Sequence, residues 1–119
     1  YRIGVEGVFK IGLNEVMIGM TMHYAGIAIA RAKLSHTYLD RSVNNSEIYN
    51  PKDAVNAGFL DVIVPEYQLL ATAIKVAGMF SKLNEKAHAA TKLRVRKLHL
   101  DALEKAIELD LAGDISLNS

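Results

Sequence analysis

The chain opens with short runs in which apolar and polar residues alternate. This pattern predicts β-strands over Tyr1–Val5 and Val8–Ile11. Glu6-Gly7 lies between them, and its glycine permits a turn or a bulge. Two strands of this length form at most a marginal ribbon.

The spacing of apolar residues then changes from two to three or four, which predicts helices. A short helix is expected over Leu13–Met20, with Asn14 as its cap and its end near Gly19. The stretch His23–Leu34 is apolar nearly all round, so we expect a helix buried against other elements. Thr37–Val43 is a further helical stretch and precedes a polar turn.

Four start and stop signals agree on one helix in the middle of the chain. Asn50 is placed as its N-cap, Pro51 fits the first helical position, and Asp53 meets the positive helix end. Gly58 supplies the left-handed stop. The β-branched and apolar run Phe59–Val64 follows and predicts a strand.

The last third of the sequence has only helical spacing. Glu66–Leu83 predicts an amphipathic helix with one buried stripe. Asn84 is expected to cap a helix over Glu85–Leu98, and a separate helix is expected over Leu100–Leu111. The residues Gly113–Ser119 are typical of a frayed tail.

These elements predict an α/β fold that is mostly helical and changes character at Pro65. Residues 1–65 mix strands and helices, and residues 66–119 are all helical. The expected strands are too few and too scattered to form a sheet among themselves, because sheets have about four to six strands. The strand at Tyr1 therefore needs a partner, and the chain is expected to be structurally incomplete by itself.

Composition narrows the function classes. Half of the residues are hydrophobic and the net charge is +1, which argues for an ordered protein and against a nucleic-acid partner. The apolar runs are shorter than the roughly 18–20 residues of a membrane span. Without cysteine there is no thiolate ligand or nucleophile, and the four histidines are scattered, so no metal site is expected. A reducing, cytoplasmic location fits the absence of cysteine.

Two motifs in this order resemble the C-terminal half of the enoyl-CoA hydratase/isomerase (crotonase) family. The first is the segment Phe9–Met20, where a short strand leads into the pair Asn14-Glu15 and then an apolar stretch that contains Gly19. The second is Pro51–Pro65, which contains the family's Ala-x-x-Ala-Gly block followed by apolar residues. The resemblance continues through the helical tail.

The resemblance implies the fold and the chemistry of that family. The fold is a spiral of β-β-α units, followed by helices that pack subunits into trimers or hexamers. The substrate is an acyl-CoA thioester, and no further cofactor is needed. In the family, two backbone N–H groups stabilise the thioester enolate, and one or two glutamates move protons. The residues that supply these N–H groups, and the second glutamate, are expected before Tyr1.

Glu15 matches the family's glutamate that follows the short strand, and is the expected general acid/base. The alternative is structural, because a carboxylate in the first turn of a helix is favoured by the helix dipole alone.

Two departures from the family pattern concern the acyl pocket. Asn14 replaces the proline of many hydratases, and Met22-His23-Tyr24-Ala25 replaces a proline followed by a glycine-rich step. Met20 and His23 are candidates for substrate contact, although a lone histidine at this place is commonly a cap or a surface group.

A basic stretch over Lys82–Lys97 is a candidate for the phosphates of CoA. It has six basic residues against the single acid Glu85, and Asp101–Asp114 has five acids against one lysine. Lys92, Arg94 and Lys97 are the candidate phosphate ligands. The alternative is two solvated helix faces, with Lys97 paired to Asp101 at the i,i+4 spacing.

Two functions of different classes remain open from the sequence. The first is the C-terminal part of an enoyl-CoA hydratase or Δ3,Δ2-enoyl-CoA isomerase, which by itself is expected to be inactive. Hydration needs two carboxylates to orient and deprotonate water, whereas isomerisation can run with one, and the Gly-Leu-Asn-Glu form favours isomerisation slightly. The second is a helical module that only associates with itself.

Overall fold

The computed structural model describes residues 1–113 and is mostly helical, as predicted. The strands are β1 (Ile3–Val5), β2 (Ile11–Gly12), β3 (Ile48–Tyr49) and β4 (Val62–Val64). The α-helices are α1 (Tyr24–Lys33), α2 (Leu39–Val43), α3 (Pro51–Ala57), α4 (Leu69–Phe80) and α5 (Glu85–Leu111). Three 3-10 turns complete the set: η1 (Val16–Ile18), η2 (His36–Tyr38) and η3 (Glu66–Gln68).

The strands form two separate two-stranded sheets, so the expectation that they cannot pair among themselves is wrong. β1 pairs in parallel with β4, with Ile3 opposite Val62, and β2 pairs antiparallel with β3, with Ile11 opposite Tyr49. The expectation that the first two strands pair as a ribbon is therefore wrong. Gly7 has φ +142°, so the chain changes direction there and carries β2 away from β1.

The signals around α3 give the structure that was predicted. The Asn50 side chain accepts a hydrogen bond of 2.8 Å from the Asp53 N–H, and Pro51 begins the helix. Gly58 ends it with φ +99°. Asn84 likewise caps α5, because its side chain accepts from the Ala87 N–H at 2.9 Å.

Two small groups of buried residues hold the first 65 residues together. In one group, Met22, Ala30 and Val43 join α1 to α2. In the other, Tyr49, Ala54 and Ala57 join β3 to α3. Ser42 and Tyr49 add a buried hydrogen bond of 2.9 Å between their hydroxyl groups. α1 packs against α2 and α5 as expected, although Ala30 is its one fully buried residue and Ile29 is 52% exposed.

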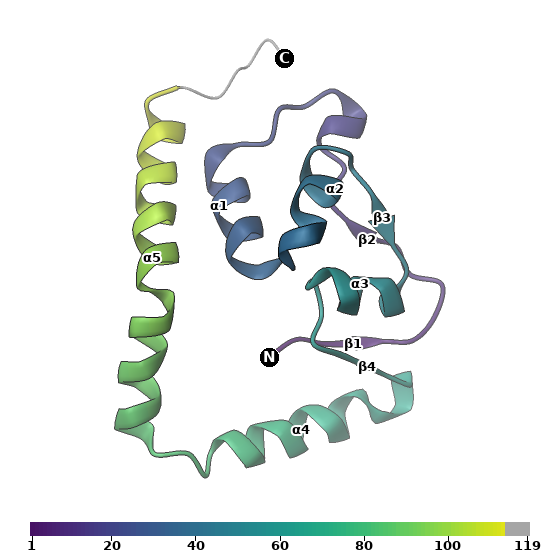
Figure 1. Ribbon diagram of the computed structural model, residues 1–119. Helices are drawn as coiled ribbons and strands as arrows, with labels where there is room; N and C mark the ends of the chain where they lie inside the picture. Colours follow the sequence, from purple (N-terminus) through teal and green to yellow (C-terminus); the bar gives the residue numbers. More distant parts are fainter. Residues whose placement is uncertain (114–119) are drawn as a thin grey trace.

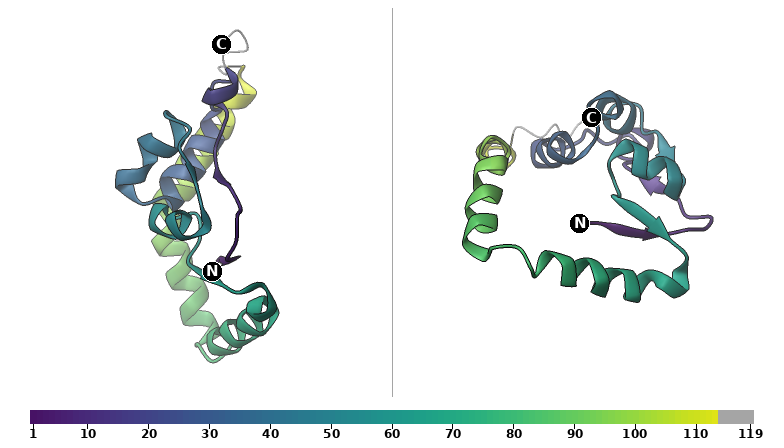
Figure 2. Two further views of the ribbon diagram at one scale, coloured as in Figure 1. Left: turned by 90° about the vertical axis from the view of Figure 1, so that its right-hand side faces the viewer. Right: turned by 60° about the horizontal axis from the view of Figure 1, so that its bottom comes forward.

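α4 and α5 form an L-shaped arm around the rest of the chain. The C-terminal part of α5 runs beside α1, whereas its first turns lie apart from α1 in Figure 1 and in the right-hand view of Figure 2. No residue of α4 is buried, so the predicted buried stripe of Glu66–Leu83 is absent from the chain as described. On α5 the apolar Leu98 is 81% exposed.

The two helices predicted after Asn84 are one continuous helix of 27 residues. Only His99 separates Leu98 from Leu100, so no glycine or proline is present there to end the first predicted helix. Lys97 and Asp101 form an i,i+4 ion pair of 2.7 Å across the predicted break. Of the predicted terminal tail, residues 114–119 lie outside the described part of the chain.

Candidate active site

The turn that carries Glu15 is shorter than the predicted helix. Glu15 precedes η1, and its backbone oxygen accepts hydrogen bonds from the N–H groups of Ile18 at 3.2 Å and Met20 at 2.8 Å. Gly19 has φ +84° and ends the helical geometry after one turn. Asn14 does not cap η1 through its side chain, so the predicted cap is wrong. The predicted end near Gly19 is confirmed.

Glu15 has a carboxylate whose surroundings are unusual for a charged group. The residue is half-buried, and its Oε2 atom is buried without a hydrogen-bond partner among residues 1–113. A buried carboxylate oxygen without a hydrogen-bond partner costs free energy, so this atom is unusual for a folded protein.

The turn separates two hollows in the surface. The first, which we call the Val16 hollow, measures about 390 Å³. Its lining residues come from the turn and from α1 and α2: Val16, Gly19, Met20, Thr21, Met22, Ile27, Val43 and Asn44. The second, which we call the Phe9 hollow, measures about 830 Å³ and is lined by residues that include Phe9, Asn14, Met17 and Tyr49. Glu15 itself lines neither hollow, but its chain neighbours do: Asn14 lines the Phe9 hollow and Val16 lines the Val16 hollow.

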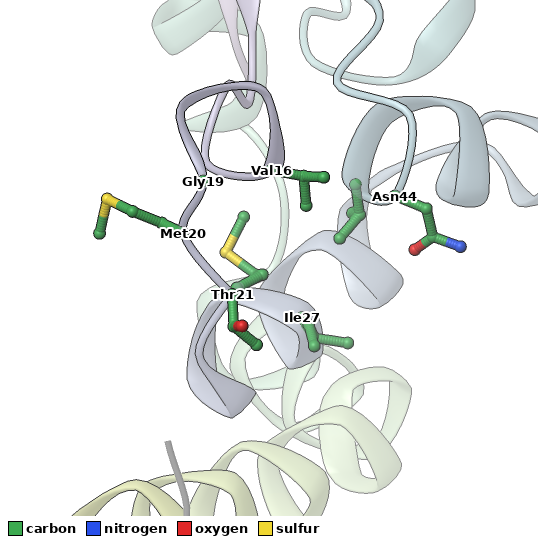
Figure 3. Close-up of a pocket in the computed structure, with 8 residues that line it drawn as sticks. Val16, Gly19, Met20, Thr21, Ile27 and Asn44 are labelled. Atoms are coloured by element: carbon green, nitrogen blue, oxygen red, sulfur yellow. The ribbon is translucent and has the colours of Figure 1, made fainter. Parts of the chain in front are cut away.

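Met20 and His23, the two predicted substrate contacts, occupy different environments. Met20 belongs to the Val16 hollow, but its side chain points away from Val16 and Ile27 (Figure 3). His23 is exposed and does not line this hollow. Its ring lies over the first turn of α1, where a Cβ on Gly26 would be 2.8 Å from its Cε1 atom. A substrate-binding role for either residue stays a prediction.

Asp110 of α5 is a contributor to the site region that sequence reasoning missed. Its two carboxylate oxygens accept hydrogen bonds from the N–H groups of Tyr24 and Ala25, both at 2.9 Å. The first turn of α1 holds no acidic residue, and His23 does not cap it. The missing cap at the start of α1 was the one available signal that a distant acceptor binds its N–H groups. The sequence did not show which acidic residue this acceptor is.

The candidate phosphate ligands lie on the exposed face of α5. The Lys97 Nζ atom donates hydrogen bonds to both carboxylate oxygens of Asp101, at 2.7 and 2.9 Å. This is the i,i+4 pair that the alternative of two solvated helix faces predicted. This hydrogen-bonded ion pair raises the pKa of Lys97. Lys92 and Arg94 are exposed on α5, whereas Glu15 lies before η1, so the candidate phosphate ligands and the candidate acid are on different elements.

Residues 1–113 contain no group of three His, Asp or Glu side chains placed to hold a metal ion. None of the helices among these residues has both the length and the apolar character required to span a membrane.

Comparison with known proteins gives consistent matches over nearly the whole chain. A family model described as enoyl-CoA hydratase/isomerase matches residues 6–115. The crystal structure of an enoyl-CoA hydratase/isomerase family protein from Pseudomonas syringae is 54% identical, with a TM-score of 0.90, over 92% of this chain and 48% of that one. The apo structure of an enoyl-CoA isomerase from Mycobacterium tuberculosis is 33% identical, with a TM-score of 0.87, over 94% and 49%.

Human mitochondrial enoyl-CoA delta isomerase 1 is similar as well, with 25% identity over 120 residues. That alignment covers 100% of this chain and 40% of the human protein, so the chain spans less than half the length of this curated relative. The matching residues include the turn of Glu15, the signals around α3 and the arm of α4 and α5. The chain therefore belongs to the enoyl-CoA hydratase/isomerase family.

Proposed function

We propose that this chain carries the general acid/base of an enoyl-CoA isomerase and that Glu15 is that residue. The observation that carries the proposal is the buried Oε2 atom of Glu15, which has no partner among residues 1–113. Membership of the family supports an acyl-CoA substrate. A single unpaired acid suits isomerisation, in which one carboxylate moves one proton between two carbons.

The chemistry requires a base and a site for negative charge. Glu15 removes a proton from C2 of a 3-enoyl-CoA, and the electron pair is delocalised onto the thioester oxygen. The same carboxylic acid returns the proton to C4, so that the double bond moves from C3–C4 to C2–C3 and no atom is gained or lost. The apolar side chains around the turn accommodate the acyl chain and keep water away from the dienolate.

We propose that the backbone N–H donors for the thioester oxygen come from polypeptide outside this chain. The relatives are about twice as long, and the chain contains two short sheets rather than a complete β-β-α spiral. Polypeptide equivalent to their remaining half would complete the sheets and add the oxyanion donors, each typically worth a few kcal/mol. We call the chain together with this polypeptide the assembled enzyme, whether the two are linked or separate.

The arm of residues 66–111 is proposed to pack against other copies of the enzyme. Apolar side chains are exposed along both of its helices, among them Leu70, Ile74, Met79, Leu93 and Leu98. Exposed apolar area of this extent is typical of a protein interface. A homotrimer, or a hexamer made of two trimers, would cover it. We propose a cytoplasmic location for this enzyme.

The assembled enzyme is expected to sediment as a trimer or hexamer and to convert a 3-enoyl-CoA into the 2-enoyl-CoA isomer. The chain alone is expected to be inactive, because the proposal places the oxyanion donors in polypeptide outside it. Turnover is followed by the absorbance of the conjugated thioester. Water addition to a 2-enoyl-CoA without isomerisation would identify a hydratase with a second carboxylate. Oligomers without turnover of either substrate would instead favour the self-association module.

Lys92 and Arg94 are proposed to bind the phosphates of CoA, from the same subunit or from a neighbouring one. Their joint replacement by alanine is expected to raise KM for the acyl-CoA by roughly 3- to 10-fold without changing kcat, because exposed ion pairs contribute up to about 1 kcal/mol each. Lys97 is already engaged by Asp101, so Lys97→Ala should raise KM less. The control is Lys52→Ala with Lys75→Ala, which removes two exposed lysines outside α5. An equal rise of KM in this control would contradict specific phosphate binding.

A further inference from the structure

Ser46 occupies a strained position between α2 and β3. Its φ is +51°, a left-handed conformation that glycine adopts without strain and serine rarely adopts. Ser46 is nevertheless buried, with 4% of its surface exposed, and among residues 1–113 it is the one residue other than glycine with positive φ. Strained residues of this kind persist where the surrounding structure requires a particular side chain.

The Ser46 side chain has a defined task. Its Oγ atom accepts a hydrogen bond of 3.1 Å from the N–H of Met17. Met17 lies in the first turn of η1, where N–H groups have no acceptor within the helix, and Glu15 does not cap this turn with its side chain. Ser46 therefore satisfies a donor two residues after Glu15, although the two segments are 29 positions apart.

Each end of this hydrogen bond lies in a turn that has further hydrogen bonds of its own. On the Ser46 side, the Glu47 N–H donates to the Arg41 oxygen at 3.0 Å, and the Arg41 guanidinium binds both oxygens of the Glu47 carboxylate at 2.6 and 2.8 Å. Arg41 also stacks on the ring of Tyr38, 4.4 Å from its centre. On the other side, the Met20 N–H binds the Glu15 oxygen and fixes the turn. The hydrogen bond from Met17 to Ser46 therefore joins two turns that are each closed by their own backbone hydrogen bonds.

We propose that Ser46 is a positioning residue for Glu15. It fixes the 3-10 turn so that the Glu15 Oε2 atom keeps its buried, unpaired state. The inference rests on the proposed function of Glu15 as the general acid/base. Ser46 itself touches neither substrate nor the reacting atoms in this scheme. The strain at Ser46 is tolerated because glycine, the residue suited to its backbone, has no oxygen for the Met17 N–H.

Two variants of Ser46 separate positioning from stability. Ser46→Ala removes the hydroxyl group and keeps the strain, whereas Ser46→Gly removes both. In the assembled enzyme we expect both variants to lower kcat by about 10-fold with KM within about 2-fold of the original value, because misplacement of a catalytic group affects the transition state most. We expect the melting temperature of the glycine variant to equal or exceed that of the alanine variant. Hydrogen exchange at the Met17 amide should accelerate in both.

The control is Ser35→Ala, because the Ser35 hydroxyl also makes one hydrogen bond, to the Asn56 oxygen at 2.9 Å, away from Glu15. It should leave kcat unchanged. Wild-type kcat in Ser46→Gly, or unchanged Met17 exchange in both variants, would overturn the proposal while turnover by the parent enzyme kept the proposed function intact. If the parent enzyme shows no turnover, the proposed function fails, and Met17 exchange still decides whether Ser46 fixes the turn.

Discussion

Glu15→Gln is expected to lower kcat of the assembled enzyme by at least about 100-fold, the usual effect of losing a general acid/base, which is the role proposed for Glu15. Glutamine has nearly the same shape as glutamate but cannot accept the C2 proton. The melting temperature should stay the same or rise, because the variant removes a charge whose Oε2 atom is buried without a partner among residues 1–113. Steady-state turnover of a 3-enoyl-CoA, with thermal unfolding of the same preparations, measures both effects.

Glu66→Gln is the matched control for Glu15. Glu66 is likewise at the start of a 3-10 helix, as the first residue of η3, whereas Glu15 is the residue just before η1, and Glu66 is exposed. If the dipole of a short helix were the reason for a glutamate at position 15, the two variants would both change stability and neither would change kcat. Turnover by Glu15→Gln within a few-fold of the parent rate would return Glu15 to that structural role.

Gly58→Ala is expected to destabilise the fold by about 2–4 kcal/mol. Gly58 has φ +99°, which costs a residue with a Cβ about 1–2 kcal/mol. A Cβ would also lie 2.8 Å from the Lys33 oxygen and 2.8 Å from the Ser35 nitrogen, and backbone atoms cannot swing aside as flexible side chains do. Denaturant unfolding of the assembled enzyme measures the change as a shift of the midpoint.

Two other glycines separate the contributions of strain and contact. Gly19 has φ +84°, but a Cβ there would have no atom within 4 Å, so Gly19→Ala should cost only the backbone strain. Gly78 lies inside α4 and a Cβ there is also free of contacts, so Gly78→Ala should stabilise the fold by about 0.5–1 kcal/mol. A loss at Gly58 no larger than the loss at Gly19 would show that the close backbone approach does not matter.

Local chemistry made some of the fold predictable from the sequence. Asn50 and Gly58 enclose α3 as expected, and Asn84 caps α5, because a cap or a left-handed stop needs only the residues beside it. The i,i+4 pair of Lys97 and Asp101 was foreseen for the same reason. The same rules also placed Glu15 at the start of a helical turn that ends at Gly19.

The features that depend on distant residues were not predicted. The pairing of β1 with β4 joins segments about 60 positions apart, and nothing in either strand specifies the other. The contact of Ser46 with Met17 needs a backbone conformation that serine seldom adopts. The buried stripe expected on α4 is exposed in the described chain, because an amphipathic pattern shows that a face needs a partner but does not say where that partner is.

The hydrogen bonds of the Asp110 carboxylate depend on how much of the chain has been synthesised. A protein is synthesised from its N-terminus, and the N–H groups of Tyr24 and Ala25 bind an acceptor that lies 86 and 85 positions later. The hydrogen bonds from Asp110 to the start of α1 can therefore form only after almost all of α5 has been made, and closing a loop of this length costs more entropy than a local contact. Ile27 on α1 lines the Val16 hollow, so the helix that Asp110 caps also supplies part of the wall of that hollow. A nascent chain that stops short of Asp110 would contain Glu15 and its turn but would have no acceptor from α5 at the start of α1.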